Sequence, residues 1–444
     1  MMQNSIGAPA CNYDVVIAGG GIAGSSMAAA LADFGYRILI VEPGLDHAKR
    51  LAGELMHPSG VDHLSELGLL NPLLAAGGIR IRGFALFTGS GANRPAHVLP
   101  YSDSCDAGSG GFAIEHGVMV RALLDHVATL SNVKVQSGSR VKGIDSNSPD
   151  GVTVTIAHTH GYDRVTAPLL VAADGRSSHI RTLAGIPHQQ SHISNMIGYM
   201  LCGAELPQPN FGHVFIGGSS PVLAYSVSRS ETRIMFDRPP DSNDDCLHAL
   251  PLSLKELTVR AIETQAPLRS ANVSITPETV FKGRTVCAGD AGGCCHPLTA
   301  TGLSACTRDA VLLRQALRET GHDIPKALQH YARRRAGPQR TRMAGADLLY
   351  AAFRAQTPEM RLLRQGLFRY WDRNPAGRIT TMDLLSMQEE RLASLAREYA
   401  QICRHSVPEL MRMETRGRTA FRLSRELVRF VGHACVDSLM MAAK

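Results

Sequence analysis

The stretch YDVVIAGGGIAGSSMAAALADFGYRILIVEP, residues 13–43, determines the fold that the sequence predicts. A β-branched strand leads into the G-x-G-x-x-G pattern of Gly19, Gly21 and Gly24, and a helix of small residues follows. A second strand then ends at Glu42. This order is typical of a dinucleotide-binding unit, in which bare glycines let a pyrophosphate approach the helix N-terminus and the acid accepts hydrogen bonds from an adenosine ribose. NAD and FAD both fit such a unit.

Two further strand ends carry a glycine beside an acid. Residues 167–181, APLLVAADGRSSHIR, predict an apolar strand followed by Asp174 and Gly175. Residues 284–293, RTVCAGDAGG, predict another strand, followed by Gly289 and Asp290. Because the carboxyl ends of parallel strands meet at one ligand crevice in a doubly wound sheet, the three strand ends predict an extended ligand that is held at both of its ends. This favours FAD.

Length and composition limit the classes of protein to consider. The chain has 444 residues, 44% of them hydrophobic, which is enough for two or three domains with cores of their own. The N-terminus lacks a signal-peptide pattern, and no run of about 18 apolar residues occurs, so we expect a cytoplasmic protein or one peripheral to a membrane. The ten cysteines show neither C-x-x-C pairs nor zinc spacing. This predicts reduced thiols and no metal site.

The positive charge of the chain lies in its C-terminal part. From Tyr331 onward there are 21 Lys and Arg against 11 Asp and Glu, although the whole chain carries only +7. This part has helical periodicity and neither interleaved aromatics nor a nucleic-acid-binding pattern, so we expect no nucleic-acid partner. We expect C-terminal helices whose basic surface faces solvent or touches a membrane surface.

Several segments resemble the squalene monooxygenase (squalene epoxidase) family of single-component, FAD-dependent monooxygenases with the aromatic hydroxylase fold. They are KRLAGELMHPSG (residues 49–60), SPVLAYSVSRSETRIMFD (220–237), GDAGGCCHPLTATGLSACTRDAVLLR (289–314) and LLRQGLFRYW (362–371). The resemblance runs through nearly the whole chain in order. The GDA sequence followed by HPLT is its most specific part.

The resemblance implies a reaction. Non-covalent FAD, reduced transiently by NADPH or NADH, would react with O₂ to form a C4a-hydroperoxide, which passes one oxygen atom to a small apolar or aromatic substrate. The outcome is epoxidation or aromatic hydroxylation, and we expect a terpenoid, polyketide or quinolone compound of secondary metabolism as substrate. The alternatives are an FAD-dependent reductase of isoprenoid double bonds, which would not consume oxygen with its substrate, and a non-catalytic lipid-binding escort protein.

The resemblance also implies an α/β fold, in which a Rossmann-like FAD-binding domain is interleaved with an antiparallel-sheet substrate-binding domain. This is the fold of aromatic hydroxylases and glutathione-reductase-type flavoproteins. We assign to the FAD-binding domain residues 12–75, 112–188 and 282–335. The substrate-binding domain takes residues 76–111 and 189–281, and residues 336–444 form a C-terminal helical region.

Positions that match the family's motifs give the expected cofactor contacts. The first turn and Glu42 would hold the ADP half of FAD, Asp290 its ribityl-pyrophosphate side, and Asp174 both FAD and the transient NADPH. Arg50 would lie near the flavin, and Arg121 would replace an arginine that the family places at Val118. The full expected set is Gly19, Gly21, Ile22, Ala23, Gly24, Glu42, Arg50, Arg121, Asp174, Gly175, Gly289, Asp290, Pro297, Gly302 and Leu303.

Two departures from the family concern the reaction site. His57 stands where the family has a glutamine that pairs with a tyrosine, which matches Tyr101 here, so we expect a pair of His57 with Tyr101 as candidate catalytic residues. A histidine can exchange a proton near neutral pH, which suits a phenol or enol substrate, or it simply holds the tyrosine. Ala300 and Thr301 stand where the family has glycines, and their Cβ atoms are expected to crowd the flavin ring.

Overall fold

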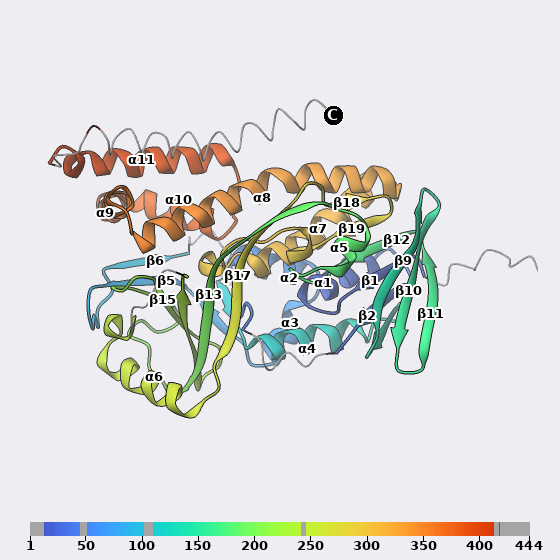
Figure 1. Cartoon of the computed structure of the whole chain (residues 1–444), viewed down its shortest axis with the longest axis horizontal. Coiled ribbons are helices and arrows are strands. Elements are labelled where there is room, and N and C mark those ends of the chain that lie inside the picture. The colour runs from blue at the N-terminus through green and yellow to red at the C-terminus, as the bar shows by residue number, and fades with distance from the viewer. Residues whose placement is uncertain (1–12, 45–50, 102–109, 241–245, 413–416, 418–444) are drawn as a thin grey trace, which may run out of the picture.

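The structure is a computed structural model that describes residues 13–44, 51–101, 110–240, 246–412 and 417. Figure 1 shows two sheets side by side, with most of the C-terminal helices above the left-hand one. Arg50, one of the expected flavin contacts, lies outside the described residues.

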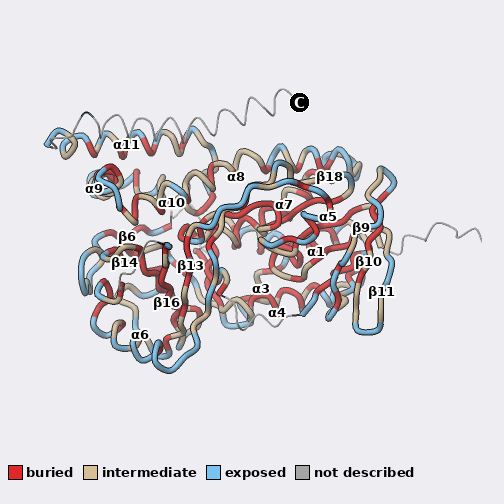
Figure 2. Tube along the Cα trace, viewed as in Figure 1, coloured by how far each residue is buried: buried red, intermediate tan, exposed pale blue. Residues whose placement is uncertain are grey.

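A six-stranded sheet, in the order β18-β19-β12-β1-β2-β8, is the centre of the first half of the molecule. All its strands pair in parallel except β18. Alternate residues of β1, such as Val15 and Val16, are buried on opposite faces of the sheet, the former against α1, α4 and α7 and the latter against β9 and β10. Because the sheet is covered on both sides, its central strands consist mainly of Val, Ile and Leu without alternating polar residues. Figure 2 shows that the centre of this half is buried.

The elements of this half are β1 (Val15–Ala18), β2 (Ile38–Glu42), β8 (Val133–Ser137), β12 (Leu169–Ala172), β18 (Phe281–Lys282), β19 (Thr285–Cys287), α1 (Ile22–Ala32), α4 (His116–Val127), α5 (His179–Leu183) and α7 (Gly302–Glu319). The covering three-stranded sheet consists of β9 (Arg140–Ser148), β10 (Gly151–His158) and β11 (Gly161–Ala167). A small sheet and two helices link the halves: β3 (Leu55–Met56), β4 (Ile79–Ile81), β7 (Gly111–Ala113), α2 (Pro58–Glu66) and α3 (Leu70–Ala75).

A seven-stranded sheet, in the order β17-β13-β16-β15-β14-β5-β6, forms the second half. It is antiparallel apart from the pair of β14 with β5. One face packs on α6, and the other packs on the C-terminal helices. Its elements are β5 (Gly83–Thr88), β6 (His97–Pro100), β13 (His188–Cys202), β14 (Gly212–Ile216), β15 (Val222–Ser226), β16 (Glu231–Arg238), β17 (Leu268–Pro277) and α6 (Leu252–Thr264).

Four helices follow: α8 (Ile324–Arg354), α9 (Pro358–Arg373), α10 (Pro375–Leu385) and α11 (Leu392–Leu410). Short 3₁₀ turns are η1 (Cys246–Ala249), η2 (Gly289–Gly292) and η3 (Pro297–Thr299). Within the described residues, no helix combines the length and apolar character needed to cross a bilayer. The predicted fold class, an α/β unit interleaved with a largely antiparallel sheet and followed by helices, is confirmed, whereas the exact domain boundaries stay a prediction.

Candidate active site

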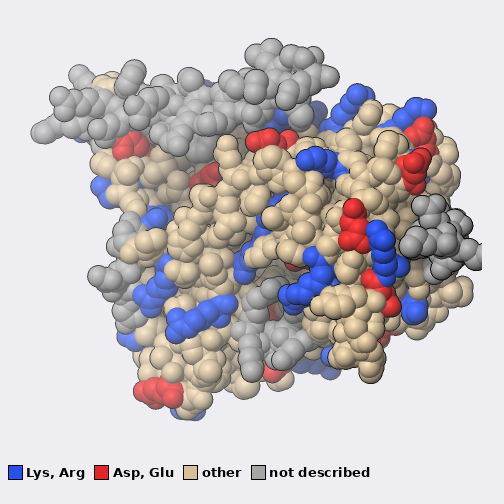
Figure 3. All heavy atoms as spheres, turned by 45° about the vertical axis from the view of Figure 1, so that its right-hand side comes forward, with Lys and Arg blue, Asp and Glu red and all other residues tan. Residues whose placement is uncertain are grey.

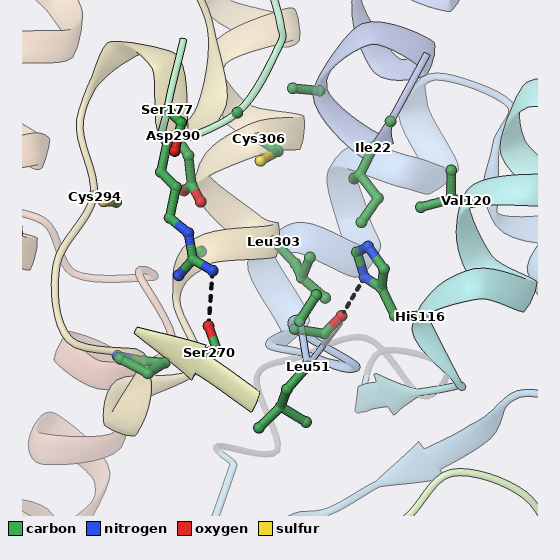
Figure 4. Close-up of a pocket in the computed structure, with 18 of the residues that line it drawn as sticks. Ile22, Leu51, His116, Val120, Ser177, Ser270, Asp290, Cys294, Leu303 and Cys306 are labelled. Atoms are coloured by element: carbon green, nitrogen blue, oxygen red, sulfur yellow. Dashed lines mark hydrogen bonds between the residues drawn. The ribbon is translucent and has the colours of Figure 1, made fainter. Parts of the chain in front are cut away.

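The three strand ends with glycine and acid motifs lie side by side, because β19, β12, β1 and β2 are consecutive in the sheet. Their turns open into one cavity of about 590 Å³, which we call the main cavity, and Figure 4 shows part of it. The expected cofactor-binding residues that line it are Gly19, Gly21, Ile22, Ala23, Glu42, Asp174, Gly175, Asp290, Pro297, Gly302 and Leu303.

The glycines of the first turn meet two different needs. Gly19 has a φ of +103°, and a Cβ on Gly24 would lie 1.9 Å from the Gly19 carbonyl oxygen, so these two positions are set by backbone packing. A Cβ on Gly21 would meet nothing within 4 Å, although Gly21 lines the main cavity. Gly21 is also the N-cap of α1 and makes no side-chain capping bond. The first amide groups of α1 are therefore left for an anion, as a pyrophosphate requires.

Glu42 is held in a fixed orientation at the end of β2. Its Oε2 accepts the N–H of Gly20 at 2.6 Å, and its Oε1 accepts the N–H of Gly44 at 2.9 Å. Each carboxylate oxygen has a second lone pair that can accept from a ligand hydroxyl. This geometry fits the ribose of an adenosine.

The turn that carries Asp290 is held from behind by α7 and α8. Gly289 donates its N–H to Asp309 Oδ2 at 2.9 Å, and Arg335 donates to Asp309 Oδ1 at 2.9 Å and to the Gly292 carbonyl at 2.8 Å. A Cβ on Gly292 would lie 2.9 Å from Arg335 Nη2. Position 292 therefore leaves no room for a side chain, because Arg335 packs behind the turn. Asp290, in contrast, lines the main cavity.

The turn after β12 supplies polar groups near solvent. Asp174 accepts the hydroxyl of Ser178 at 2.5 Å and the N–H of Ile180 at 3.0 Å, and Gly175 has a φ of +80°. Arg140 and Arg176 also line the main cavity. Figure 3 shows basic side chains around a hollow on this face. A negatively charged ligand is therefore favoured at this end of the main cavity.

The opposite wall of the main cavity is apolar. The side chains that form it come from the seven-stranded sheet and its neighbours: Leu51, Phe84, Met196, Leu223, Tyr225, Met235 and Leu298. A polar cradle and an apolar wall thus share one cavity, as an enzyme needs when a charged cofactor acts on an apolar compound.

A buried ion pair supports Tyr225 in this wall. Arg233 donates from Nη2 to Glu54 Oε1 at 2.7 Å and from Nε to Glu54 Oε2 at 2.9 Å, and Tyr225 donates its hydroxyl to Oε2 at 3.4 Å. Burial raises the pKa of Tyr225 well above its ordinary value, so the phenol keeps its proton. Sequence analysis missed this pair, for which the signal is an arginine inside the otherwise apolar segment TRIMF.

The predicted pair of His57 and Tyr101 is present, with the Tyr101 hydroxyl 2.9 Å from His57 Nδ1. On the other side of the ring, Nε2 lies 2.6 Å from the carbonyl oxygen of Thr299. Burial lowers the pKa of His57 to about 4, so the ring is neutral near pH 7. Because a carbonyl only accepts, Nε2 carries the proton and Nδ1 accepts from Tyr101. Both side chains are buried, and neither lines the main cavity.

His296, which does line the main cavity, joins a buried polar cluster that sequence analysis did not find. Its Nδ1 accepts the N–H of Leu298 at 3.2 Å, and its Nε2 lies 3.1 Å from Ser194 Oγ and 3.4 Å from Asp237 Oδ1. Tyr350 donates to Asp237 Oδ2 at 2.6 Å. Burial raises the pKa of Asp237, but His296, Ser194 and Tyr350 together hold that pKa below its ordinary value. The cluster ties the HPLT turn to the second sheet and to α8.

Three of the expected contacts that the structure describes do not line the main cavity. Arg121 lines a separate hollow of about 790 Å³, the side cavity, whereas its neighbour Val120 faces the main cavity. Val118 lines the side cavity as well, so Arg121 and Val118 lie on the same side of α4, as expected, and a flavin contact of Arg121 stays a prediction. Gly24 and Gly289 lie behind the cavity wall, where close packing explains them.

Comparisons with known proteins match this geometry. A model of the squalene epoxidase family matches residues 166–423. The chain is 30% identical over 397 residues to squalene epoxidase erg1 of Aspergillus fumigatus, covering 81% of this chain and 79% of the relative. The chain belongs to the squalene epoxidase family. Another family member, squalene epoxidase 2, mitochondrial, of Arabidopsis thaliana, is 29% identical over 90% of this chain and 71% of its own.

Solved structures share the fold of this family member. PqsL of P. aeruginosa, solved in complex with 2-aminobenzoylacetate, aligns with a TM-score of 0.66 and 19% identity over 77% of this chain and 96% of that one. The p-nitrophenol 4-monooxygenase PnpA of Pseudomonas putida aligns with a TM-score of 0.69 and 16% identity over 84% and 97%. The chain is an FAD-dependent monooxygenase, and NADPH and O₂ are the usual reductant and oxidant of its family.

At positions 300 and 301, where the family has glycines, the two residues of this chain differ in backbone conformation. Ala300 has a φ of +52° and a ψ of 20°, in the left-handed region that favours glycine. Thr301 has a φ of −82°, so its backbone does not need glycine, and its Oγ1 lies 3.1 Å from Thr299 Oγ1. Of the two, only Ala300 is strained in this squalene epoxidase family member.

Proposed function

We propose that this monooxygenase transfers one oxygen atom from O₂ to an electron-rich carbon of an apolar or aromatic small molecule, in terpenoid, polyketide or quinolone secondary metabolism. The main observation in support is that a glycine-lined dinucleotide cradle and an apolar wall share one cavity of about 590 Å³. A pocket of this size is within the range of small-molecule sites. Both epoxidation and aromatic hydroxylation are compatible with such a wall.

The residues present fit FAD. We propose that the amides at Gly21 and the Glu42 carboxylate hold its ADP half, with Asp174, Gly175 and Asp290 along the rest of the cofactor. FAD supplies the activation of oxygen, and the protein orients the substrate and excludes water. Burial, with the nearby Glu54 carboxylate, raises the pKa of Tyr225 and keeps the phenol protonated. The Glu54–Arg233 pair holds its hydroxyl in place, so the substrate meets a rigid surface.

We propose a positioning role for His57 and Tyr101, in place of the acid–base role that the sequence left open. Both ring nitrogens of His57 are engaged, by Thr299 and Tyr101, and the ring has no direct access to the main cavity. A His57→Gln variant is then expected to keep the pH profile of product formed per NADPH oxidised. If the variant loses one limb of that profile, His57 acts as an acid or base.

Oxygen uptake by the FAD-loaded protein tests the proposed function. NADPH oxidation is to be measured with squalene and with 1-naphthol as representatives of the two substrate classes, under ¹⁸O₂. We expect one ¹⁸O atom in the product and oxygen uptake that depends on both FAD and substrate, with FAD-free protein as the control. A protein that takes up no FAD, or that consumes NADPH with substrate but no oxygen, contradicts the proposal.

We further propose that the C-terminal region touches membrane surfaces peripherally. Val407 and Met411 are exposed on and just after α11, 47% and 59% respectively, next to the basic residues Arg404 and Arg412. An apolar strip beside cations is suited to the interface of an anionic bilayer. Co-sedimentation with vesicles containing phosphatidylserine tests this, and recovery of all the protein in the supernatant contradicts it.

A further inference from the structure

The buried arginines of the described residues differ in their partners. They are Arg181, Arg233, Arg308, Arg314, Arg335 and Arg342. Four of these arginines form ion pairs with the carboxylates of Glu54, Glu390, Asp33, Glu66 and Asp309. Arg181 donates to two backbone carbonyl groups, those of Ala291 and Arg176.

Neither Arg181 nor Arg342 forms an ion pair with a described carboxylate, but of these six arginines Arg342 alone lines the main cavity. Its Nη2 donates to the Gly293 carbonyl at 3.0 Å, its Nε is buried without a partner, and it forms no ion pair with the carboxylates that the structure describes. The residue is only 7% exposed. A buried cation without a counter-charge is costly, and arginine does not lose its proton to avoid that cost. Because Arg342, unlike Arg181, lines the main cavity, an anion that enters this cavity can supply the counter-charge.

Arg342 lies where two cavities meet. It lines the main cavity and also a small apolar cavity of about 80 Å³, the helix cavity, whose walls are leucines and other side chains of α8, α9, α10 and α11. Thr301 lines both cavities as well. A ligand at this junction meets the guanidinium of Arg342 and, beside it, an apolar space.

We propose that Arg342 binds a negatively charged group of the substrate, such as a carboxylate, phenolate or enolate, while the apolar part of the substrate packs toward the helix cavity. The inference rests on the proposed function, since it names the substrate class of that cavity. The position favours substrate over cofactor, because the helix cavity is lined by none of the dinucleotide motifs that line the main cavity. Guanidinium groups pair well with such oxyanions.

Anion binding at Arg342 has a consequence for the reaction. A phenol or enol that binds as its anion releases a proton to solvent on binding and is more electron-rich at the carbon that accepts oxygen. No protein base is then needed in the main cavity. This agrees with a neutral His57 that is buried outside that cavity.

A pair of probes that differ only in charge tests the inference. Dissociation constants of dodecanoate and dodecan-1-ol are to be measured by equilibrium dialysis at pH 8 with the FAD-loaded protein. We expect the wild type to bind dodecanoate at least about tenfold more tightly than the alcohol. Arg342→Gln should remove this preference, and Arg342→Lys should keep part of it. Arg333→Gln, an exposed arginine on the same helix, is the charge-matched control and should leave the preference unchanged.

The outcomes separate the two proposals. Equal binding of both probes to the wild type overturns the inference without the use of any variant, and so does a preference that survives in Arg342→Gln. If Arg342→Gln loses FAD affinity while the preference remains, the anion belongs to the cofactor and the inference is also overturned. Failure of the proposed function would appear elsewhere, as absent NADPH-dependent oxygen uptake in a protein that still discriminates the probes.

Discussion

The Thr299 carbonyl oxygen accepts a hydrogen bond from His57 Nε2 at 2.6 Å, immediately before the chain enters the left-handed region at Ala300. The two residues are 242 positions apart in the sequence. His57 therefore fixes one end of the turn whose next residue lines the main cavity. The geometry of that turn depends on a neutral histidine and on an alanine that tolerates a positive φ.

Ala300→Gly should stabilise the protein slightly. A non-glycine residue in the left-handed region costs about 1–2 kcal/mol, which the glycine variant avoids. The greater freedom of glycine in the unfolded chain lowers the gain in stability by about 0.4–1 kcal/mol. We expect the free energy of unfolding to rise by roughly 0.5 kcal/mol, measured by urea denaturation. Ala400→Gly, at an exposed position inside α11, should lower it by about 1 kcal/mol. A loss of stability in both variants would show that Ala300 is unstrained.

His57 should make stability depend on pH below neutrality. Burial depresses its folded-state pKa to about 4 from an ordinary 6.5, so the unfolded chain binds the extra proton between these values. The free energy of unfolding then falls as pH drops from 6.5 to 4, by up to about 1.4 kcal/mol per pH unit for each such group. His63 and His213 contribute in the same direction.

Urea midpoints of the wild type and His57→Gln at pH 7 and pH 5 measure how much of this pH dependence of stability comes from His57. The variant should lose less stability between the two pH values, because glutamine does not titrate. Above pH 7 the two proteins should show parallel curves. Identical losses between pH 7 and pH 5 would mean that His57 is charged, or solvated, in the folded protein.

The buried Glu54–Arg233 pair should be sensitive to the loss of either partner. Glu54→Gln leaves a buried guanidinium without its counter-charge, which costs about 3–5 kcal/mol of stability. The double variant Glu54→Leu/Arg233→Met should recover most of this loss, since apolar side chains of similar size often replace buried ion pairs. Asp14→Asn removes the exposed pair with Arg37 and should cost less than about 1 kcal/mol. Equal effects of Glu54→Gln and Asp14→Asn would rule out a buried pair.

The cofactor side of the cavity could be predicted from the sequence because its signals are local. The glycines and acids follow directly after apolar strands, and the parallel order of those strands brings Gly21, Asp174 and Asp290 together. Arg121 shows the limit of this reasoning. The three-residue spacing from Val118 places Arg121 on the same side of α4 as Val118, but it does not show that the main cavity lies on the side of Val120.

Partners that are distant in the sequence could not be predicted. Glu54 and Arg233 are 179 residues apart, and Arg335 reaches Gly292 and Asp309 from another helix. Periodicity shows that such a residue lies in a helix or strand, but it does not show which distant element supplies the matching charge. The pair of His57 with Tyr101 was found only because the resemblance to the family supplied it. Nor does the sequence around Arg342 show that no described carboxylate pairs with it, because that depends on which distant elements surround the side chain.

Gly21 and Gly24 should respond differently to alanine, because one faces the cavity and the other faces the backbone. A Cβ on Gly21 meets nothing within 4 Å in the protein, so Gly21→Ala should leave the melting temperature of the FAD-free protein unchanged while weakening FAD binding at least about tenfold, or about 1.4 kcal/mol. A Cβ on Gly24 lies 1.9 Å from the Gly19 carbonyl oxygen, so Gly24→Ala should lower the melting temperature even without FAD. FAD fluorescence titration and thermal unfolding of the FAD-free proteins give the two readouts. Undiminished FAD affinity in Gly21→Ala would contradict the placement of the pyrophosphate at the N-terminus of α1.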